Sequence, residues 1–425
     1  MTAFEQMNKQ QLQQQLEQLQ QQYEQFRAQN LSLDMSRGKP GAEQLALTSE
    51  MLTCVDPSDF RAENGLDTRN YGILDGIPEA KRLFAELLGV QPENVIVGGN
   101  SSLNMMFDYI ATAYSKGICG QTPWCKQEKL RFLCPVPGYD RHFAVTEFFG
   151  FELVPVAMSQ SGPDMDAVEA LVQDPTVKGI WCVPMYSNPD GYTYSDETVR
   201  RFAALRPAAK DFRIMWDNAY CVHHLTDTPD TLLNIYEAAK QAGNEDIVIQ
   251  FASTSKISFP GAGVAVLAAS PANVADIKKR MAIQTIGHDK MNMLRHARYF
   301  RDAEGIRAHM KKHAAILRPR FETVLRVLDE QLAQSGIATW HKPNGGYFIS
   351  VNLLSGCAKE TVRLCKEAGV VMTGAGATWP LGRDPQDSNL RIAPSFPTLQ
   401  ELETAMQLFC VCAKLAAVQK LLASL

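Results

Sequence analysis

The residues best suited to chemistry in this chain come at the ends of apolar runs. Lys256 follows the run IVIQFAS, and Asp217 ends the run RIMWD. A lysine delivered to a cleft by a buried strand has a lowered amine pKa, which frees the nucleophilic form. An aspartate at a strand end is partly buried and needs a cationic partner, for which a protonated ring nitrogen would serve. The alternatives are a solvated surface lysine and an aspartate that caps a helix.

Three more side chains follow strand-like runs. Tyr220 lies three residues after Asp217, and Asn188 lies in SNPDG after GIWCVP, so both could reach one hydroxyl group of a bound ring. Tyr139 in PVPGYD could stack on the same ring. Each of these features taken alone is also common turn or packing chemistry.

A phosphate site is indicated by VIVGGNSSLNMMFDYI, where a strand passes through glycines and hydroxyl residues into a helix. Free N–H groups and the helix dipole attract anions there. Gly99, Asn100, Ser101 and Ser102 are the candidates, and a plainly capped helix start is the alternative. The G-K-[ST] signature of nucleotide hydrolases is absent.

An arginine late in the chain could hold a carboxylate. Arg391, in SNLRIAPSF, could face the cleft from the opposite wall and bind a carboxylate with two hydrogen bonds. A surface ion pair is the alternative.

The elements that must position these residues are seven short apolar runs separated by helical patterns. The runs are NVIVGGN, RFLCPVP, FELVPVAM, GIWCVPMY, RIMWDNAY, DIVIQFASTS and GVAVLAAS. This alternation predicts a mainly parallel sheet with helices on both faces, and such sheets bind ligands at the carboxyl ends of their strands.

The remaining segments predict a second, α+β domain and an N-terminal helix. GYFISVNL, GVVMTG and NLRIAPS read as strands before a closing helix, and residues 8–29 read as an amphipathic helix packed on the body. Because single cores stop growing near roughly 250 to 300 residues, we expect two domains. The predicted division is 1–50 (helix and arm joining the small domain), 51–310 (large domain) and 311–425 (small domain).

Composition narrows the classes of function. The 425 residues are 45% hydrophobic and carry a net charge of −4, which gives no global attraction to nucleic acid or anionic lipid. The sequence shows no leader pattern, and no stretch approaches the roughly 20 apolar residues of a membrane span. Ten scattered cysteines without C-x-x-C pairs indicate reduced thiols and no metal site, so a cytoplasmic protein is expected.

The motifs GGNSS, PGY, SNPDG, DNAY, S-x-S-K and a late L-R, in this order, resemble those of fold-type I, class I aminotransferases, which depend on pyridoxal 5'-phosphate (PLP). The resemblance covers nearly the whole chain. It implies an α/β fold with a mainly parallel seven-stranded sheet between helices and a smaller α+β domain. RGKPG, TRNYGILDG, SNPDGYTYS and STSKISFPGAG are similar to the aspartate aminotransferase branch called subgroup Ic.

The resemblance also implies roles for the residues around the ring of the cofactor. Lys256 matches the lysine that holds the cofactor as a Schiff base, and Asp217 matches the partner of the pyridine nitrogen. Tyr220 and Asn188 match the groups that bind the ring hydroxyl. Tyr139 matches the aromatic residue that stacks on the ring.

Further matches concern the phosphate of the cofactor. The implied phosphate-binding residues lie on two segments: Asn100, Ser101, Ser102, Ser253 and Ser255. The family's arginine eight residues after the lysine is replaced here by Val264, which puts the charge balance of the phosphate in doubt. Arg37 or Lys39 could replace it; unaltered PLP affinity in both alanine variants would exclude them.

The substrate and the partner subunit are implied in the same way. Arg391 matches the residue that binds the substrate α-carboxylate, with Gly38 beside it. Tyr71 resembles the tyrosine that reaches the phosphate in the neighbouring subunit, which implies a homodimer with shared sites.

The implied reaction is transfer of an amino group from an L-amino acid, aspartate first, to 2-oxoglutarate by ping-pong kinetics. A dicarboxylic substrate needs a second cation, for which Lys39, Arg141 and Lys290 are candidates. The alternatives are an aminotransferase for aromatic or 2-aminoadipate substrates, a PLP β-lyase, and the effector-sensing domain of a transcription regulator. The short N-terminal extension and the acidic balance oppose the last of these.

Overall fold

The computed structural model describes residues 3–425, and its larger part is a sheet of order β2-β9-β8-β7-β6-β3-β4-β5. The strands are β2 (Val95–Val97), β3 (Arg131–Val136), β4 (Glu152–Ser159), β5 (Gly162–Pro163), β6 (Val177–Cys182), β7 (Arg213–Asp217), β8 (Val248–Ser253) and β9 (Ala265–Ala269). Strands β4, β3, β6, β7 and β8 are mutually parallel, whereas β9 is antiparallel to both neighbours. The seven predicted strands and the fold class are confirmed. The two-residue β5 adds an eighth strand at one edge.

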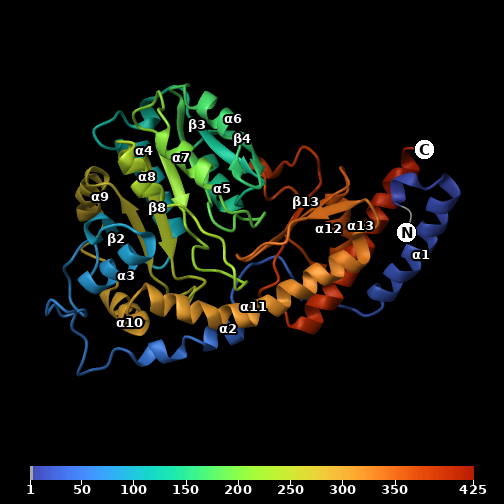
Figure 1. The fold of residues 1–425 in the computed structure, drawn as a ribbon, viewed down its shortest axis with the longest axis horizontal. Coiled ribbons are helices and arrows are strands. Elements are labelled where there is room, and N and C mark those ends of the chain that lie inside the picture. Colours follow the sequence, from blue (N-terminus) through green and yellow to red (C-terminus); the bar gives the residue numbers. More distant parts are fainter. Residues whose placement is uncertain (1–2) are drawn as a thin grey trace.

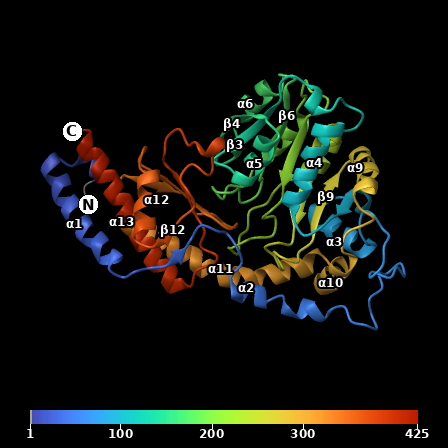
Figure 2. The ribbon, with the colours of Figure 1, turned by 180° about the vertical axis from the view of Figure 1, so that it is seen from behind.

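Helices cover both faces of this sheet (Figure 1; Figure 2 shows the opposite side). They are α3 (Pro78–Leu88), α4 (Ser102–Lys116), α5 (Asp140–Phe148), α6 (Met165–Leu171), α7 (Asp196–Ala204), α8 (Ile235–Gln241), α9 (Pro271–Gln284) and α10 (Lys290–Phe300). Phe132 and Cys134 of β3 pack with α4, α5 and α9, whereas Leu133 packs with α6, α7 and α8. Because both faces are buried at the centre of the sheet, β3, β6 and β7 are largely apolar instead of alternating with polar residues, whereas β4 is partly exposed. We call this sheet with its helices the large unit.

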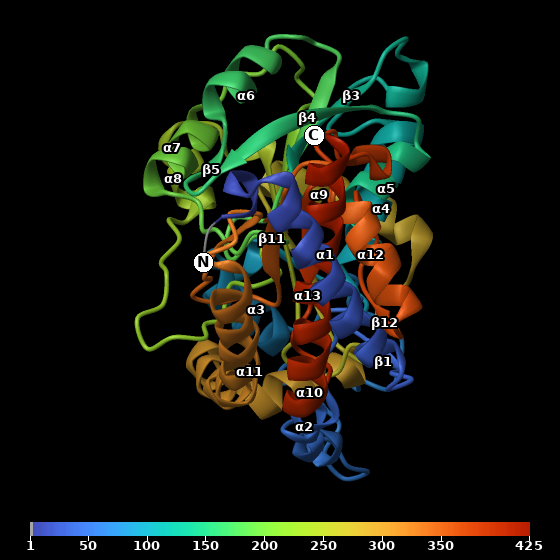
Figure 3. The same cartoon turned by 90° about the vertical axis from the view of Figure 1, so that its right-hand side faces the viewer.

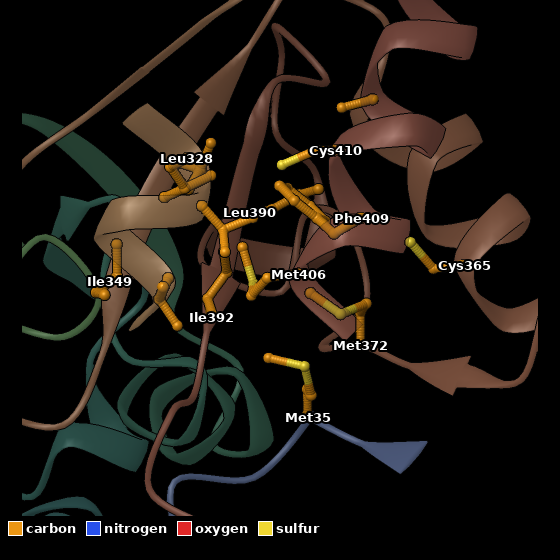
Figure 4. Close-up of a cluster of buried hydrophobic side chains, with 14 of the residues drawn as sticks. Met35, Leu328, Ile349, Cys365, Met372, Leu390, Ile392, Met406, Phe409 and Cys410 are labelled. Carbon is orange, nitrogen blue, oxygen red and sulfur yellow. The ribbon is translucent and has the colours of Figure 1, made fainter. Parts of the chain in front are cut away.

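A second, smaller unit contains an antiparallel sheet of order β10-β11-β13. Its elements are β10 (Ala338–Trp340), β11 (Ile349–Leu353), α12 (Ala358–Glu367), β12 (Val370–Val371), β13 (Asn389–Ile392) and α13 (Leu399–Ala423). Side chains of β13 and α13, among them Leu390, Ile392, Met406 and Phe409, form its core (Figure 4). Strand β1 (Leu33–Asp34) pairs in parallel with β12, so the N-terminal segment is part of this small unit.

The predicted N-terminal helix is confirmed as α1 (Lys9–Arg27), which begins with a capping box at Asn8. Leu12, Leu19 and Tyr23 are buried, and α1 lies along α13 (Figure 3). Helix α13 is long and apolar enough to cross a membrane by composition alone. In the structure, 67% of its most apolar window is buried, as in the core helix of a globular unit.

Helix α11 (Ala303–Leu332) connects the two units and runs beside the short α2 (Ala42–Ala46) (Figure 1). Ile306 packs with the large unit and Val324 with the small one. The predicted domain limits stay a prediction, and the one at residue 310 falls inside this helix.

Single 3-10 turns complete the secondary structure: η1 (Phe4–Gln6), η2 (Ser49–Thr53), η3 (Pro92–Asn94), η4 (Trp124–Lys126), η5 (Glu245–Ile247) and η6 (Pro380–Gly382).

Candidate active site

A cavity of about 780 Å³ lies at the carboxyl ends of the parallel strands, between the two units. Most of the predicted site residues line it: Gly38, Ser101, Ser102, Tyr139, Asn188, Asp217, Tyr220, Ser253, Ser255, Lys256 and Arg391. Gly99, Asn100 and Tyr71 do not line it, and neither do the candidate cations Lys39 and Lys290. Strand order explains the convergence, because β8, β7, β6 and β3 are consecutive neighbours and end at the same edge.

Lys256 lies three residues beyond the end of β8, with Nζ 5.1 Å from the centre of the Tyr220 ring. Burial lowers the pKa of this amine, the Asp217 carboxylate raises it, and Arg391 lowers it. The net direction is downward, so the neutral, nucleophilic amine is favoured.

Asp217 ends β7 and is paired with a residue that the sequence reasoning missed. His142 Nε2 lies 3.0 Å from Asp217 Oδ2, and the histidine ring stacks on Trp181 at 4.5 Å. Asp217 Oδ1 is buried and has no hydrogen-bond partner among residues 3–425. A buried acceptor without a donor is costly, so this oxygen is available for an N–H group of a ligand.

Two tyrosines flank this carboxylate. Burial raises the pKa of Tyr220 well above its usual value and that of Tyr139 to about 12. Both phenols therefore stay protonated and can donate a hydrogen bond at neutral pH.

Arg391 of β13 enters the cavity from the small unit. Its Nη1 donates to Asn188 Oδ1 and to Asp140 Oδ1, both at 3.2 Å, and its guanidinium lies 4.7 Å from the Phe348 ring centre. Nε is buried without a partner in the described chain. The edge formed by Nε and Nη2 can therefore bind a carboxylate with two parallel hydrogen bonds.

Gly38 brings the N-terminal segment against the same wall. A Cβ atom at this position would lie 2.5 Å from Phe348 Cζ, so only glycine allows the approach. The segment thereby covers Phe348, which in turn supports Arg391.

Hydroxyl groups gather where α4 begins. Ser101 is its N-cap and Ser102 its first residue, and Ser253 Oγ donates to Ser255 Oγ at 3.0 Å. Hydroxyls beside the free N–H groups of a helix start have the chemistry to bind an anion. Ser255 Oγ also donates to Asn100 O, but the Asn100 side chain turns away toward Pro260 O.

Other predicted positions also have definite places. Tyr71 is 77% exposed on the surface, and Val264 is buried in an apolar cluster. Arg37 and Arg141 line the cavity. Lys39 lies instead over the Phe396 ring, 3.9 Å from its centre, and Lys290 is buried outside the cavity lining.

Buried histidines give the protein a predicted sensitivity to acid. Burial lowers the pKa of His296 from 6.5 to about 4, so the unfolded chain binds a proton at higher pH than the folded one. Stability is then complete above pH 6.5 and decreases as pH falls toward 4, by about 3 kcal/mol for this residue. Urea unfolding at pH 7 and pH 5 measures the effect. The H296L variant should lose less stability over that interval, and an equal loss would contradict the prediction.

These residues fit pyridoxal phosphate. The site offers an amine with a lowered pKa, an unpartnered carboxylate oxygen for a ring N–H, and hydroxyls at a helix N-terminus for a phosphate. Each matches one reactive or charged part of that cofactor.

Comparisons with known proteins define the class first and then the family. The fold is shared with an α-aminoadipate aminotransferase from Thermus thermophilus, at a TM-score of 0.74 and 19% identity over 93% of this chain and 94% of that one. A crystal structure of an aspartate transaminase from Corynebacterium glutamicum matches at a TM-score of 0.97 and 46% identity, covering 99% of each chain. The fold is that of the PLP-dependent aminotransferases.

The sequence comparisons agree with the structural ones. The aspartate amino-transferase family model matches residues 7–424. An aspartate aminotransferase from Corynebacterium glutamicum is 49% identical over 93% of this chain and 91% of its own length. A putative aminotransferase from Mycolicibacterium smegmatis is 47% identical over 99% of both. The chain belongs to the aspartate aminotransferase family; it is a transaminase, and the comparisons indicate pyridoxal phosphate as its cofactor.

Proposed function

We propose that this enzyme transfers the amino group of L-aspartate to 2-oxoglutarate by a ping-pong mechanism. The observation that carries the proposal is that one cavity is lined by Lys256, Asp217 and Arg391. The amine pKa of Lys256 is lowered, and Asp217 Oδ1 and Arg391 Nε have no hydrogen-bond partner among the described residues. The 49% identity to an aspartate aminotransferase supports aspartate as the donor.

Each residue has a physical task in this reaction. When bound, pyridoxal phosphate supplies an aldehyde for covalent attachment of amines and a ring that accepts electrons. Lys256 Nζ would hold this group as the nucleophile and would be the base that takes the proton from the substrate Cα. Asp217 Oδ1 would accept from the ring nitrogen, and His142 holds the other carboxylate oxygen in place. Tyr220 and Asn188 would present polar groups to the ring hydroxyl, and Tyr139 would stack on the ring.

The test is a visible spectrum of the purified protein. Aspartate should shift the band of the lysine-bound cofactor, and 2-oxoglutarate should restore it, because the two half-reactions share one cofactor. Failure with aspartate and success with an aromatic or 2-aminoadipate donor would move the assignment to one of those activities.

Arg391 binds the α-carboxylate of every substrate in this proposal. R391K keeps the charge but loses the two-pronged geometry, so kcat/KM should fall about 10- to 100-fold for donor and acceptor alike. Steady-state kinetics with both substrates measures this. R383K, an exposed arginine of the same unit, is the matched control. An unchanged kcat/KM for either substrate in R391K would contradict the role.

For the side-chain carboxylate, we propose Arg141, the only one of the candidates Lys39, Arg141 and Lys290 that lines the cavity. R141A should lower kcat/KM for aspartate about 10- to 100-fold and leave that for alanine unchanged, because only the dicarboxylic substrate loses an ion pair. An equal change for both donors would exclude Arg141.

We also propose a cytoplasmic homodimer with shared active sites. The side chains of Tyr71 (77% exposed), Ile283 (91%) and Ile286 (63%) are large, apolar or aromatic, and exposed. The backbone at Gly287 contacts that of Ile73, so their segments are adjacent. Exposed apolar groups of this kind mark a protein interface, and a second copy would bring its Tyr71 to this phosphate site. A monomer in sedimentation velocity at micromolar concentration would contradict the proposal.

A further inference from the structure

The turn that carries Lys256 is fastened by side chains that do not enter the cavity. Thr254 and Ser258, on either side of the lysine, are fully buried, and so is His296 of α10. Ser258 Oγ lies 2.8 Å from His296 Nε2 and 3.0 Å from Thr254 Oγ1. None of the three is among the residues lining the cavity.

Chemistry fixes the direction of these hydrogen bonds. His296 Nδ1 lies 2.7 Å from Asn292 O, and because a carbonyl can only accept, Nδ1 carries the hydrogen. In the neutral ring, Nε2 is then an acceptor and receives the hydrogen of Ser258 Oγ. Ser258 Oγ also lies 3.2 Å from Thr254 O, but that carbonyl already accepts from the N–H groups of Ile257 and Ser258, whereas Nε2 has no other donor. With its one hydrogen given to Nε2, Ser258 Oγ accepts from Thr254 Oγ1. Thr254 Oγ1 in turn accepts from the Val264 N–H at 2.9 Å.

The result is one directional chain from Val264 N–H through Thr254 and Ser258 to His296 and Asn292 O, in which each hydrogen is used once. A protonated His296 would place a second donor against Ser258 and break this order. Burial lowers the pKa of His296, and Arg295 acts in the same direction. The hydrogen bond to Asn292 O and the charge of Asp289 oppose it, but burial is the largest effect, so the neutral ring is favoured.

The chain also starts at the position where the resemblance predicted an arginine. Val264 contributes its backbone N–H to Thr254 and accepts from Thr254 N at 2.9 Å. Its side chain packs with Met293 and Leu294 of α10. Uncharged groups therefore hold the turn that carries Lys256 on the side away from the cavity.

We propose that His296 is a positioning residue for Lys256: as the neutral, Nδ1-protonated ring it fixes the lysine turn through Ser258 and Thr254. It touches neither substrate nor cofactor. The inference rests on the proposed function, because positioning Nζ matters only where Lys256 is the nucleophile and the base.

The test compares purified holoenzymes carrying H296L, H296Q and S258A. The glutamine introduced by H296Q keeps an oxygen that can accept from Ser258, whereas the leucine introduced by H296L does not. H296L and S258A should lower kcat about tenfold or more with unchanged KM, because a displaced reacting group is costly. Both should shift the pH at which the visible band changes by about half a unit. H296Q should keep most of the wild-type kcat and a nearly unchanged pH for the visible band. The double variant H296L/S258A should lower kcat little further than either single variant does.

Two controls keep the test decisive. T361V removes a fully buried hydroxyl in α12 whose one hydrogen-bond partner within residues 3–425 is Cys357 O, and it should leave kcat and the spectrum unchanged. Nitrogen-15 NMR of histidine-labelled enzyme reads the tautomer directly, whatever the activity. An Nε2-protonated His296 would overturn the proposal, and so would an H296L or S258A enzyme that behaves like T361V or an H296Q enzyme as impaired as H296L. If H296L does not fold, S258A carries the kinetic test. A wild-type protein without transaminase activity would instead refute the proposed function.

Discussion

Replacement of Lys256 by alanine is expected to lower kcat by at least about 10⁴-fold, because one amine acts as nucleophile and as proton acceptor. Burial at the end of β8 lowers its pKa, and no other lysine lines the cavity among the described residues. Single-turnover kinetics with aspartate measures the loss. Borohydride reduction followed by peptide mass spectrometry should find the cofactor on the peptide containing Lys256 in the native enzyme.

An exposed lysine of α8 provides the control. K240A removes the same functional group at the surface and should retain full activity and full labelling. Labelling of a lysine other than Lys256 in the native enzyme would refute the assignment of Lys256 as the residue that binds the cofactor.

The second large effect is expected for D217N, which should lower kcat by roughly 10²- to 10³-fold. In the proposed reaction this carboxylate stabilises positive charge on the ring, and removal of one such preorganised contact raises a barrier by about 3–4 kcal/mol, where about 1.4 kcal/mol corresponds to a tenfold change in rate. The amide also offers a donor where the proposed ring N–H needs an acceptor. Rapid-mixing kinetics of the half-reaction with aspartate measures the change.

Asp211 offers a matched buried carboxylate far from the chemistry. It pairs with Lys178 at 3.0 Å and accepts from the Trp124 indole. D211N should destabilise the fold and leave kcat per bound cofactor unchanged. A D217N enzyme with the kinetics of D211N would show that the carboxylate at position 217 has only a structural role.

The sequence predicted the sheet well because its strands are buried on both faces. Each central strand, such as β3 and β7, is a continuous apolar run, and the polar residue after it marks the carboxyl end. The sequence therefore predicts that Lys256 and Asp217 share one cavity. The pairing of β1 with β12 could not be predicted, because two-residue strands more than 330 positions apart carry no pattern.

The site residues that the sequence did not reveal act through tertiary contacts. His142 lies in the first turn of α5, not at a strand end, and only the fold brings its Nε2 to Asp217. Its spacing of three residues from Tyr139 was the one available signal. Lys39 was a candidate cation, but its ammonium packs on the Phe396 ring. Because Phe396 is distant in the sequence, the segment around Lys39 gives no sign of this contact.

Helix α11 is continuous from the large unit to the small unit and so connects the two walls of the cavity. Lys256 and Asp217 belong to the large unit and Arg391 to the small one. A wider space between these residues would therefore require α11 to bend. Pro319 lies inside α11 and lacks the N–H that would bond one turn back, which makes this the weakest point against bending. If the two units move apart, α11 should therefore bend at Pro319 before it bends elsewhere along its length.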